Sequence, residues 1–250
     1  MAGHSKFKNI QHRKGAQDKK RAKLFTKLVR EIITAAKIGG VDSSANPRLR
    51  NSIITARGYN LPKERIDRAL AQATDPTNLD NYAENRYEGF APGGIAFIVE
   101  TLTDNKNRTA AEVRSAFSKH GGQLSETGSV SFMFDRVGRI DFLKNIGSDD
   151  EVLENAIEGG ANDVLSTEDG HTIYTDVESY IHCLDYLMSK YQEPIESEIE
   201  WKPQSIIIID DEEKAIKLMK LVDALEESDD VQKVFCNYEF TDEIFDKLNN

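Results

Sequence analysis

Positively charged side chains are concentrated near the N-terminus of an otherwise acidic chain. The 250-residue sequence has a formal net charge of -11. Residues 1–70 contain 17 Lys or Arg and only 5 Asp or Glu, whereas the remaining 180 residues contain 15 and 38. Ammonium and guanidinium groups bind phosphate oxygens through charge-assisted hydrogen bonds. The asymmetry therefore predicts a polyanion-binding module joined to an acidic body, and charge alone leaves a solvated basic tail as the alternative.

The candidate contacts to a nucleic acid are the basic side chains of this N-terminal region. Because Lys and Arg neutralise phosphates whatever the base, they predict affinity and not sequence preference. The candidate nucleic-acid-binding residues are Lys6, Lys8, His12, Arg13, Lys14, Lys19, Lys20, Arg21, Lys23, Lys27, Arg30, Arg48 and Arg50.

A second polar group lies in the stretch TDNKNRT, residues 103–109, between an expected strand and an expected helix. Asp104, Asn105 and Arg108 could grip a ligand at the start of that helix. An Asx turn followed by a helix cap accounts for the same residues, and we prefer this structural interpretation. The three residues are kept as a candidate ligand or interface loop.

The sequence contains no arrangement that predicts catalysis, a metal or a cofactor. The glycine-rich stretch at 91–94, APGG, lacks the Lys-Ser/Thr of a phosphate-binding loop, so we expect a tight turn before a strand. Cys183 and Cys236 stand far apart and are expected to be reduced, and the five histidines form no zinc pair. The acid pairs at 210–211 and 229–230 fall at expected helix ends, where capping and solvation explain them. We therefore predict that the protein is not an enzyme.

An amphipathic helix at residues 16–38 is expected to position most of the basic candidates. At about 100° per residue, its apolar side chains gather within one arc. They are Leu24, Phe25, Leu28, Val29, Ile32, Ile33 and Ala36. The opposite side, which we expect to be the outer face, carries Lys19, Lys20, Lys23, Lys27 and Arg30. The glycines at 39–40 end the helix.

Two shorter helices are expected to complete a helical N-terminal unit. In residues 45–60, Asn46 is the N-cap and Pro47 takes the first helical position, and the next helix starts with Pro62. Their Arg57, Lys63, Arg65 and Arg68, with the two arginines already named, extend the positive region. Three helices of this size resemble a helix-turn-helix unit, although the spacing identifies no recognition helix. Residues 74–85 are expected to be a linker.

Beyond residue 85 the hydrophobic pattern alternates between strands and helices. A strand at 94–102 leads to a helix at 108–122, for which Thr109 and Glu112 form the expected capping box. Further strands are expected at 128–134, 138–143, 163–167, 171–176, 195–204, 205–210 and 230–240, and further helices at 149–161, 177–191 and 211–228.

This order predicts an α+β multidomain fold in which one unit is inserted into another. The expected domains are a basic three-helix domain at 1–76, an α+β domain formed by 82–135 plus 201–250, and an inserted α+β domain at 136–200. Each α+β domain is expected to be a small antiparallel sheet with helices on one face, which is a ferredoxin-like arrangement.

The sequence gives no sign of a membrane or secretory segment. No apolar run approaches the length of a membrane-spanning helix, and the first ten residues lack the apolar core of a signal peptide. We expect a cytoplasmic protein without a membrane partner. The oligomeric state is left open, a monomer included.

Six stretches together resemble the YebC/PmpR family, which also includes the mitochondrial translational activator of cytochrome c oxidase. They are residues 1–32, 45–50 (ANPRLR), 87–109, 112–122 (EVRSAFSKHGG), 128–134 (GSVSFMF) and 229–234 (DDVQKV). The resemblance covers essentially the whole chain, with Phe7 where the family usually has Trp and Ala91 where it usually has Gly. It implies a helical domain followed by two α+β domains, no enzyme activity, and a cytoplasmic DNA-binding transcriptional regulator. Some relatives are tied instead to translation on the ribosome.

Three functional hypotheses follow from the residues. A DNA-binding regulator accounts for the basic helix, and a factor that contacts rRNA or tRNA on the ribosome also accounts for the acidic body. A protein–protein adaptor, whose basic arm binds an acidic partner, has no distinctive support. With the resemblance added, we expect DNA-binding transcription regulation first and RNA binding in translation regulation second.

Overall fold

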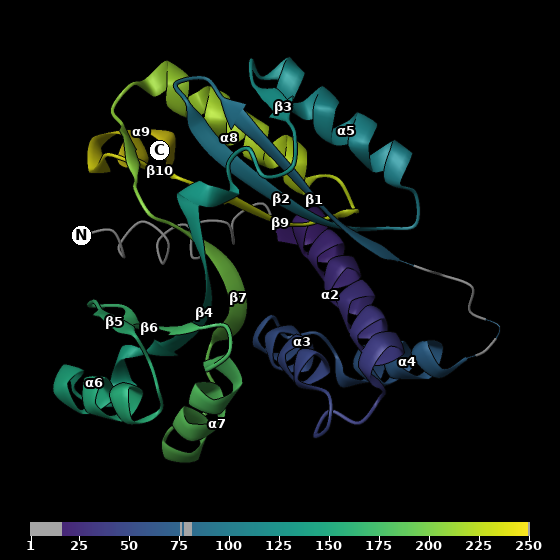
Figure 1. Cartoon of the computed structure of the whole chain (residues 1–250), viewed down its shortest axis with the longest axis vertical. Coiled ribbons are helices and arrows are strands. Elements are labelled where there is room, and N and C mark those ends of the chain that lie inside the picture. Colours follow the sequence, from purple (N-terminus) through teal and green to yellow (C-terminus); the bar gives the residue numbers. More distant parts are fainter. Residues whose placement is uncertain (1–16, 76, 78–81, 250) are drawn as a thin grey trace.

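The computed structural model describes residues 17–75, 77 and 82–249 (Figure 1). It is an α+β molecule with an N-terminal helical region followed by two antiparallel sheets. The candidate residues Lys6, Lys8, His12, Arg13 and Lys14 lie outside the described residues, as do the side chains of Lys19 and Lys20. None of the helices in the described part has the length and apolar character needed to cross a bilayer.

The helical region consists of α2 (Gln17–Gly39), α3 (Pro47–Gly58) and α4 (Lys63–Thr74). The apolar arc of α2 packs on the other two helices, with Ile32 and Leu49 completely buried at the centre of their shared core. The N-cap at Asn46 and the proline at the first position of α3 are confirmed, and both are local signals that sequence reasoning reads well.

The first sheet has the strand order β3-β1-β2-β9 and is antiparallel throughout. Its strands are β1 (Ala83–Ala91), β2 (Ile95–Thr103), β3 (Gln123–Ser125) and β9 (Val231–Cys236). The helices α5 (Lys106–Lys119) and α8 (Glu212–Glu226) pack on one face, around Phe97 and Phe117. The expected turn at 91–94 is confirmed, since Gly93 and Gly94 adopt positive φ angles between β1 and β2.

The second sheet is formed by residues inserted between β3 and α8. Its strands are β4 (Phe134–Leu143), β5 (Asp163–Ser166), β6 (Gly170–Asp176) and β7 (Glu196–Pro203), in the order β5-β6-β4-β7. The helices α6 (Asp149–Glu158) and α7 (Tyr180–Lys190) share its core. The chain order β-α-β-β-α-β with this strand order is the predicted ferredoxin-like arrangement.

The long strands β4 and β7 connect the two sheets, as Figure 1 shows. Phe134 and Trp201, from the beginning of β4 and the end of β7, pack on the face of the first sheet that α5 and α8 leave open. The insertion is therefore anchored by packing as well as by the chain. The predicted domain boundaries themselves stay a prediction.

Several expected elements differ in the structure. Residues 74–85 are not all linker, because β1 begins at Ala83 and pairs with β2 as far as Thr103. The expected strand at 128–134 is wrong: Ser131–Met133 is a 3-10 turn, η2, that ends where β4 begins. The buried carboxylate of Glu88 holds this turn, since it accepts hydrogen bonds from the backbone N–H groups of Val130 and Ser131 at 2.8 and 3.0 Å.

The capping box expected at Thr109 and Glu112 is also wrong. Helix α5 begins at Lys106, two residues before the expected start, and Asn105 is its N-cap. The hydroxyl of Thr109 instead points into the protein, where it donates to Asp230.

The C-terminal segment also departs from the expectation of a single strand at 230–240. The chain forms β9, then Asn237, then β10 (Tyr238–Phe240), which pairs in parallel with β8 (Ile207–Ile209). The side-chain oxygen of Asn237 accepts a hydrogen bond from Ala96 N–H at 2.8 Å, which stabilises the break. The final helix, α9 (Asp242–Asn249), was not expected.

Candidate nucleic-acid interface

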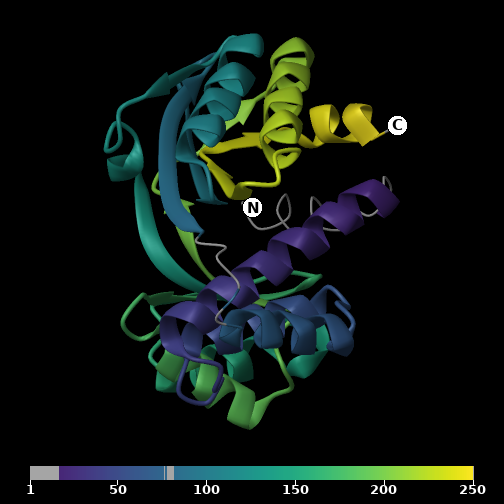
Figure 2. The same cartoon turned by 90° about the vertical axis from the view of Figure 1, so that its right-hand side faces the viewer.

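The basic residues of α2 do not share one solvent-facing side. Lys23 Nζ donates to Glu227 O at 2.6 Å, and Lys27 Nζ donates to Glu226 O at 2.8 Å. Both carbonyls lie at the C-terminal end of α8. Carbonyls there lack intrahelical partners, and the negative end of the helix dipole lies at the same place. The face expected to be outermost therefore packs, along these residues, against the body of the protein. In Figure 2, α2 (purple) extends from the other two helices of this region towards the first sheet and its helices.

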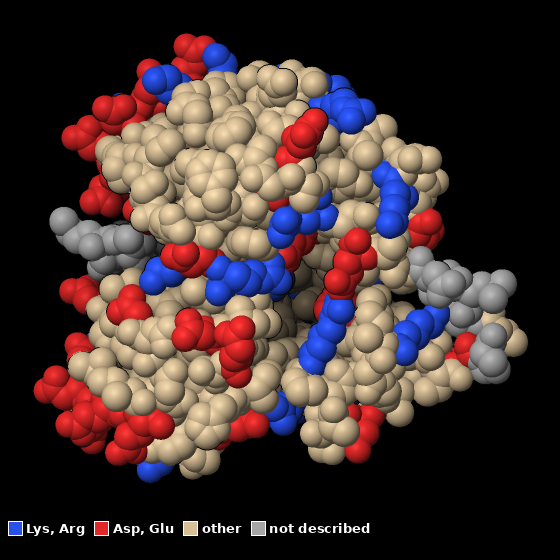
Figure 3. All heavy atoms as spheres, viewed as in Figure 1, with Lys and Arg blue, Asp and Glu red and all other residues tan. Residues whose placement is uncertain are grey.

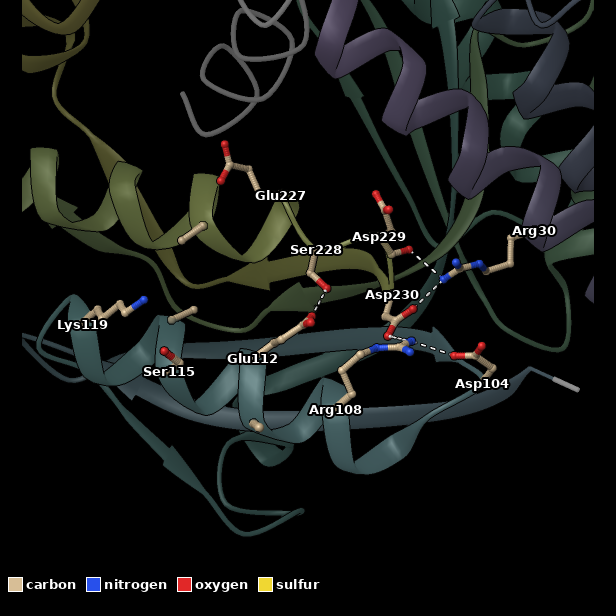
Figure 4. A pocket seen from close by; sticks show the side chains of 13 residues that line it. Arg30, Asp104, Arg108, Glu112, Ser115, Lys119, Glu227, Ser228, Asp229 and Asp230 are labelled. Atoms are coloured by element: carbon tan, nitrogen blue, oxygen red, sulfur yellow. Dashed lines mark hydrogen bonds and ion pairs between the residues drawn. The ribbon is translucent and has the colours of Figure 1, made fainter. Parts of the chain in front are cut away.

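Arg30, one helical turn further along α2, ends in a buried polar cluster (Figure 4). Its Nη1 donates to Leu102 O, Asp229 O and Asp230 Oδ1, each at 2.9 Å. Asp230 is only 4% exposed, although the sequence had suggested solvation for this acid pair. Asp230 is buried because its carboxylate lies where α2, the start of α5 and the start of β9 converge.

Asp230 accepts hydrogen bonds from three further side chains. Arg108 Nη2 lies 2.7 Å from Oδ2, and the hydroxyls of Thr103 and Thr109 donate to the same oxygen at 2.9 and 2.8 Å. Burial alone would raise the pKa of Asp230, but these donors and Arg30 lower it below its ordinary value. The carboxylate is thus held ionised between two guanidinium groups.

The candidate loop at 104–108 is built around this cluster. Asn105 caps α5 by accepting from Arg108 N–H at 3.1 Å, as the structural interpretation expected. Arg108 also pairs with Asp104 at 2.7 Å. Asp104 and Arg108 line a groove of about 890 Å³ between α5 and the end of α8, which Figure 4 shows from close by. Since Arg108 and Arg30 share one carboxylate, this loop belongs to the contact between α2 and the first sheet.

The same contact also changes the pKa of Lys27. Burial lowers its pKa from 10.5 to about 8, although the carboxylates of Glu226 and Asp229 raise it, and the neighbouring charges of Lys23 and Arg30 lower it further. A lysine in this position is a contact between parts of the fold and is not freely available to a phosphate.

The two arginines predicted on α3 are engaged as well. Arg48 pairs with Glu31 at 2.7 Å and with Glu84 at 2.5 Å, and Arg50 pairs with Asp185 at 3.2 Å. These pairs join α3 to α2, to β1 and to α7. The structure therefore brings Arg48 and Arg50 to contacts with other elements and not to a common basic surface with α2.

The α3 segment also contacts β7 and α7 through polar side chains that the sequence did not single out. Tyr59 donates to the carboxylate of Glu196 at 3.3 Å, and Asn51 donates to the hydroxyl of Tyr180 at 3.2 Å. Burial and the nearby charge of Glu198 raise the pKa of Glu196 to about 7. Alternating acids on a strand gave no signal that this one faces a helix of the N-terminal region.

Three arginines remain exposed where α2 meets α4. The guanidinium carbons of Arg21 and Arg65 lie 5.3 and 5.7 Å from the centre of the Phe25 ring. Arg68 is exposed on the same helix as Arg65. Across the described side chains, no carboxylate approaches any of the three within 4.0 Å.

Figure 3 shows how charged side chains are distributed over one face of the molecule. In Figure 3, acidic side chains gather along the outer margins, including the region over α6, whereas basic side chains form a band across the waist over β4 and β7. Several residues of these strands are basic but paired, such as Arg136 with Glu100 at 2.5 Å and Lys202 with Asp163 at 3.3 Å. The waist is therefore a region of mixed charge.

Comparison with known proteins places the chain among established relatives. The family model described as "TACO1/YebC protein N-terminal domain" matches residues 5–76, and the model "TACO1/YebC second and third domain" matches residues 82–238. A probable transcriptional regulatory protein of Rickettsia bellii is 63% identical over 99% of this chain and 97% of its own. One of Rickettsia rickettsii is 62% identical over 98% of each.

A solved structure shares the fold. The crystal structure of a conserved hypothetical protein from Aquifex aeolicus matches with a TM-score of 0.81 and 45% sequence identity, over 91% of this chain and 93% of that one. The similarity thus extends over the helical region and both sheets. The chain belongs to the TACO1/YebC family.

Proposed function

We propose that the protein is a non-enzymatic, cytoplasmic regulator of gene expression that binds DNA through its basic N-terminal region. The observation that carries this proposal is the separation of charge, with 17 basic and 5 acidic residues in 1–70 against 15 and 38 in the rest. Relatives named as probable transcriptional regulatory proteins support it. Basic side chains on helices bind the phosphate backbone irrespective of base sequence. We therefore expect these residues to contribute affinity for DNA and little preference for particular bases.

Binding of labelled duplex DNA, followed by fluorescence anisotropy over a series of salt concentrations, tests the proposal. If about six phosphates are neutralised, log K should fall against log salt with a slope near -5. A structured RNA measured in parallel supplies the comparison. The absence of duplex binding at about 50 mM salt would overturn DNA binding.

The second candidate function is a translation factor that contacts rRNA or tRNA on the ribosome. It is favoured by the acidic body, because negative charge near duplex DNA is unfavourable whereas ribosomal proteins are a suitable basic partner. Co-sedimentation with ribosomes that survives DNase treatment would support this function. Absence from ribosomal fractions, with duplex DNA bound tightly, would exclude it.

A further inference from the structure

The basic side chains of the helical region fall into two groups according to what they contact. Lys23, Lys27 and Arg30 bind carbonyls at or just beyond the end of α8, and Arg30 also binds the carboxylate of Asp230. Each of them already donates to the body of the protein, and Arg30 donates to a buried carboxylate, so a phosphate would compete with these contacts. These side chains therefore form intramolecular contacts that attach the helical region to the first sheet and its helix α8.

The second group lies at the other flank of α2, where this helix packs on α4. Arg21 and Arg65 come from different helices and lie over the ring of Phe25, at 5.3 and 5.7 Å. A guanidinium held over an aromatic face keeps its N–H groups, which radiate in the plane of the guanidinium, available for a further partner. The ring thus contacts guanidinium groups from two different helices without neutralising either of them.

Arg68 extends this surface along α4. It follows Arg65 by three residues, so both side chains lie on the same flank of the helix. Arg21, Arg65 and Arg68 are all exposed, and within the described part of the chain they have no carboxylate partner. Three neighbouring positive charges repel one another, and a polyanion relieves that repulsion.

We propose that Arg21 and Arg65, which contact the Phe25 ring, together with Arg68 on the same flank of α4, form the surface that contacts the sugar–phosphate backbone of a nucleic acid. Lys23, Lys27 and Arg30 then serve to hold the two parts of the molecule together. The inference rests on the proposed nucleic-acid-binding function and names the residues that perform it. It moves the interface from the flank of α2 that faces α8 to the edge shared by α2 and α4.

Two charge-matched variants separate these roles. R65Q/R68Q removes two positive charges from the proposed surface, and K23Q/K27Q removes two from the contact with α8. Each is measured by anisotropy with a labelled duplex DNA and with a hairpin RNA, between about 50 and about 200 mM salt. For the duplex, the magnitude of the salt slope is expected to fall by about 2 in R65Q/R68Q and to stay unchanged in K23Q/K27Q. R65K/R68K, which keeps the charge, should retain the wild-type slope.

The outcomes distinguish failure of the surface from failure of the function. If wild-type protein binds but R65Q/R68Q keeps the wild-type slope, or if K23Q/K27Q lowers it equally, the assignment of the surface is wrong and the function stands. If wild-type protein binds neither nucleic acid at about 50 mM salt, the function itself is wrong. Circular dichroism checks folding, and R21Q provides an independent single variant whose slope should fall by about 1.

Discussion

At the scale of single residues, Asp230 joins segments that are far apart in the sequence. Its carboxylate receives Arg30 from α2, Arg108 from α5 and Thr103 from the end of β2. A buried ion pair adds little compared with an apolar contact of equal size, but removing one partner leaves the others desolvated and unpaired. A substitution of Asp230 that removes the charge but keeps the side-chain volume should therefore still lower the stability of the fold.

We expect D230N to lower the free energy of unfolding by about 3 kcal/mol at neutral pH, because two guanidinium groups lose their shared counterion. The folded-state pKa of Asp230 is below its ordinary value, so its stabilising effect is present above the unfolded pKa near 4 and is lost as the pH falls. Urea denaturation at several pH values measures both effects. The difference between wild type and D230N should shrink towards acid.

The neighbouring residue supplies a matched control. Asp229 is exposed, and Arg30 binds its backbone carbonyl, which a side-chain substitution leaves in place. D229N should therefore change the free energy of unfolding by no more than about 0.5 kcal/mol. Equal losses in D229N and D230N would contradict the role given to the buried carboxylate.

At the scale of secondary-structure elements, Asn46 fixes the corner between α2 and α3. Its Oδ1 accepts from Leu49 N–H at 3.1 Å, and its Nδ2 donates to Ala35 O and Gly40 O, both at 2.8 Å. A Cβ at Gly39 would lie 2.6 Å from Asn46 Nδ2, so the close approach requires glycine there. One side chain thus caps the start of α3 and satisfies carbonyls at the end of α2.

We expect N46A to lower the free energy of unfolding by about 2 kcal/mol, since it removes an N-cap and takes the Asn46 donor from the buried carbonyl of Ala35. N105A is the matched control, because Asn105 caps α5 in the same way but is exposed. Its loss should be about 1 kcal/mol. Thermal and urea denaturation compare the two variants, and a larger loss in N105A would count against the dual role of Asn46.

At the scale of the whole molecule, positive charge on α2 serves the attachment of the helical region. The contact places ammonium groups at the negative end of α8, nearly 200 residues away in the chain. The pKa of Lys27 reports this contact, because burial against the end of α8 lowers it to about 8. The cost of burying its charge is fully present below this pH and disappears as the pH rises and the amine becomes neutral.

NMR of labelled lysine side chains should therefore show that Lys27 titrates near pH 8. Lys217, on α8, is the internal reference, since its pair with Glu213 raises the pKa above 10.5. In D230N, which weakens the contact, the pKa of Lys27 should move upward towards the ordinary lysine value. Titration of Lys27 near 10.5 in the wild type would show that α2 does not rest on α8 in solution.

Local signals in the sequence determined much of the fold. The apolar arc of residues 24–36, the cap at Asn46, the glycine turn at 93–94 and the β-α-β-β-α-β order of the insertion were all identified correctly. Each of these depends on residues close together in the chain, or on a periodicity that one helix or strand imposes. The concentration of basic residues before residue 70 was likewise evident from the sequence.

Tertiary structure alone decided which basic residues remain available. Lys23 and Arg68 have the same charge and both lie on amphipathic helices, yet one meets the end of α8 and the other faces solvent. Periodicity distinguishes the apolar side of a helix from its polar side. It cannot tell whether the polar side meets water or the carbonyls and carboxylates of a distant element, because that depends on how the elements pack.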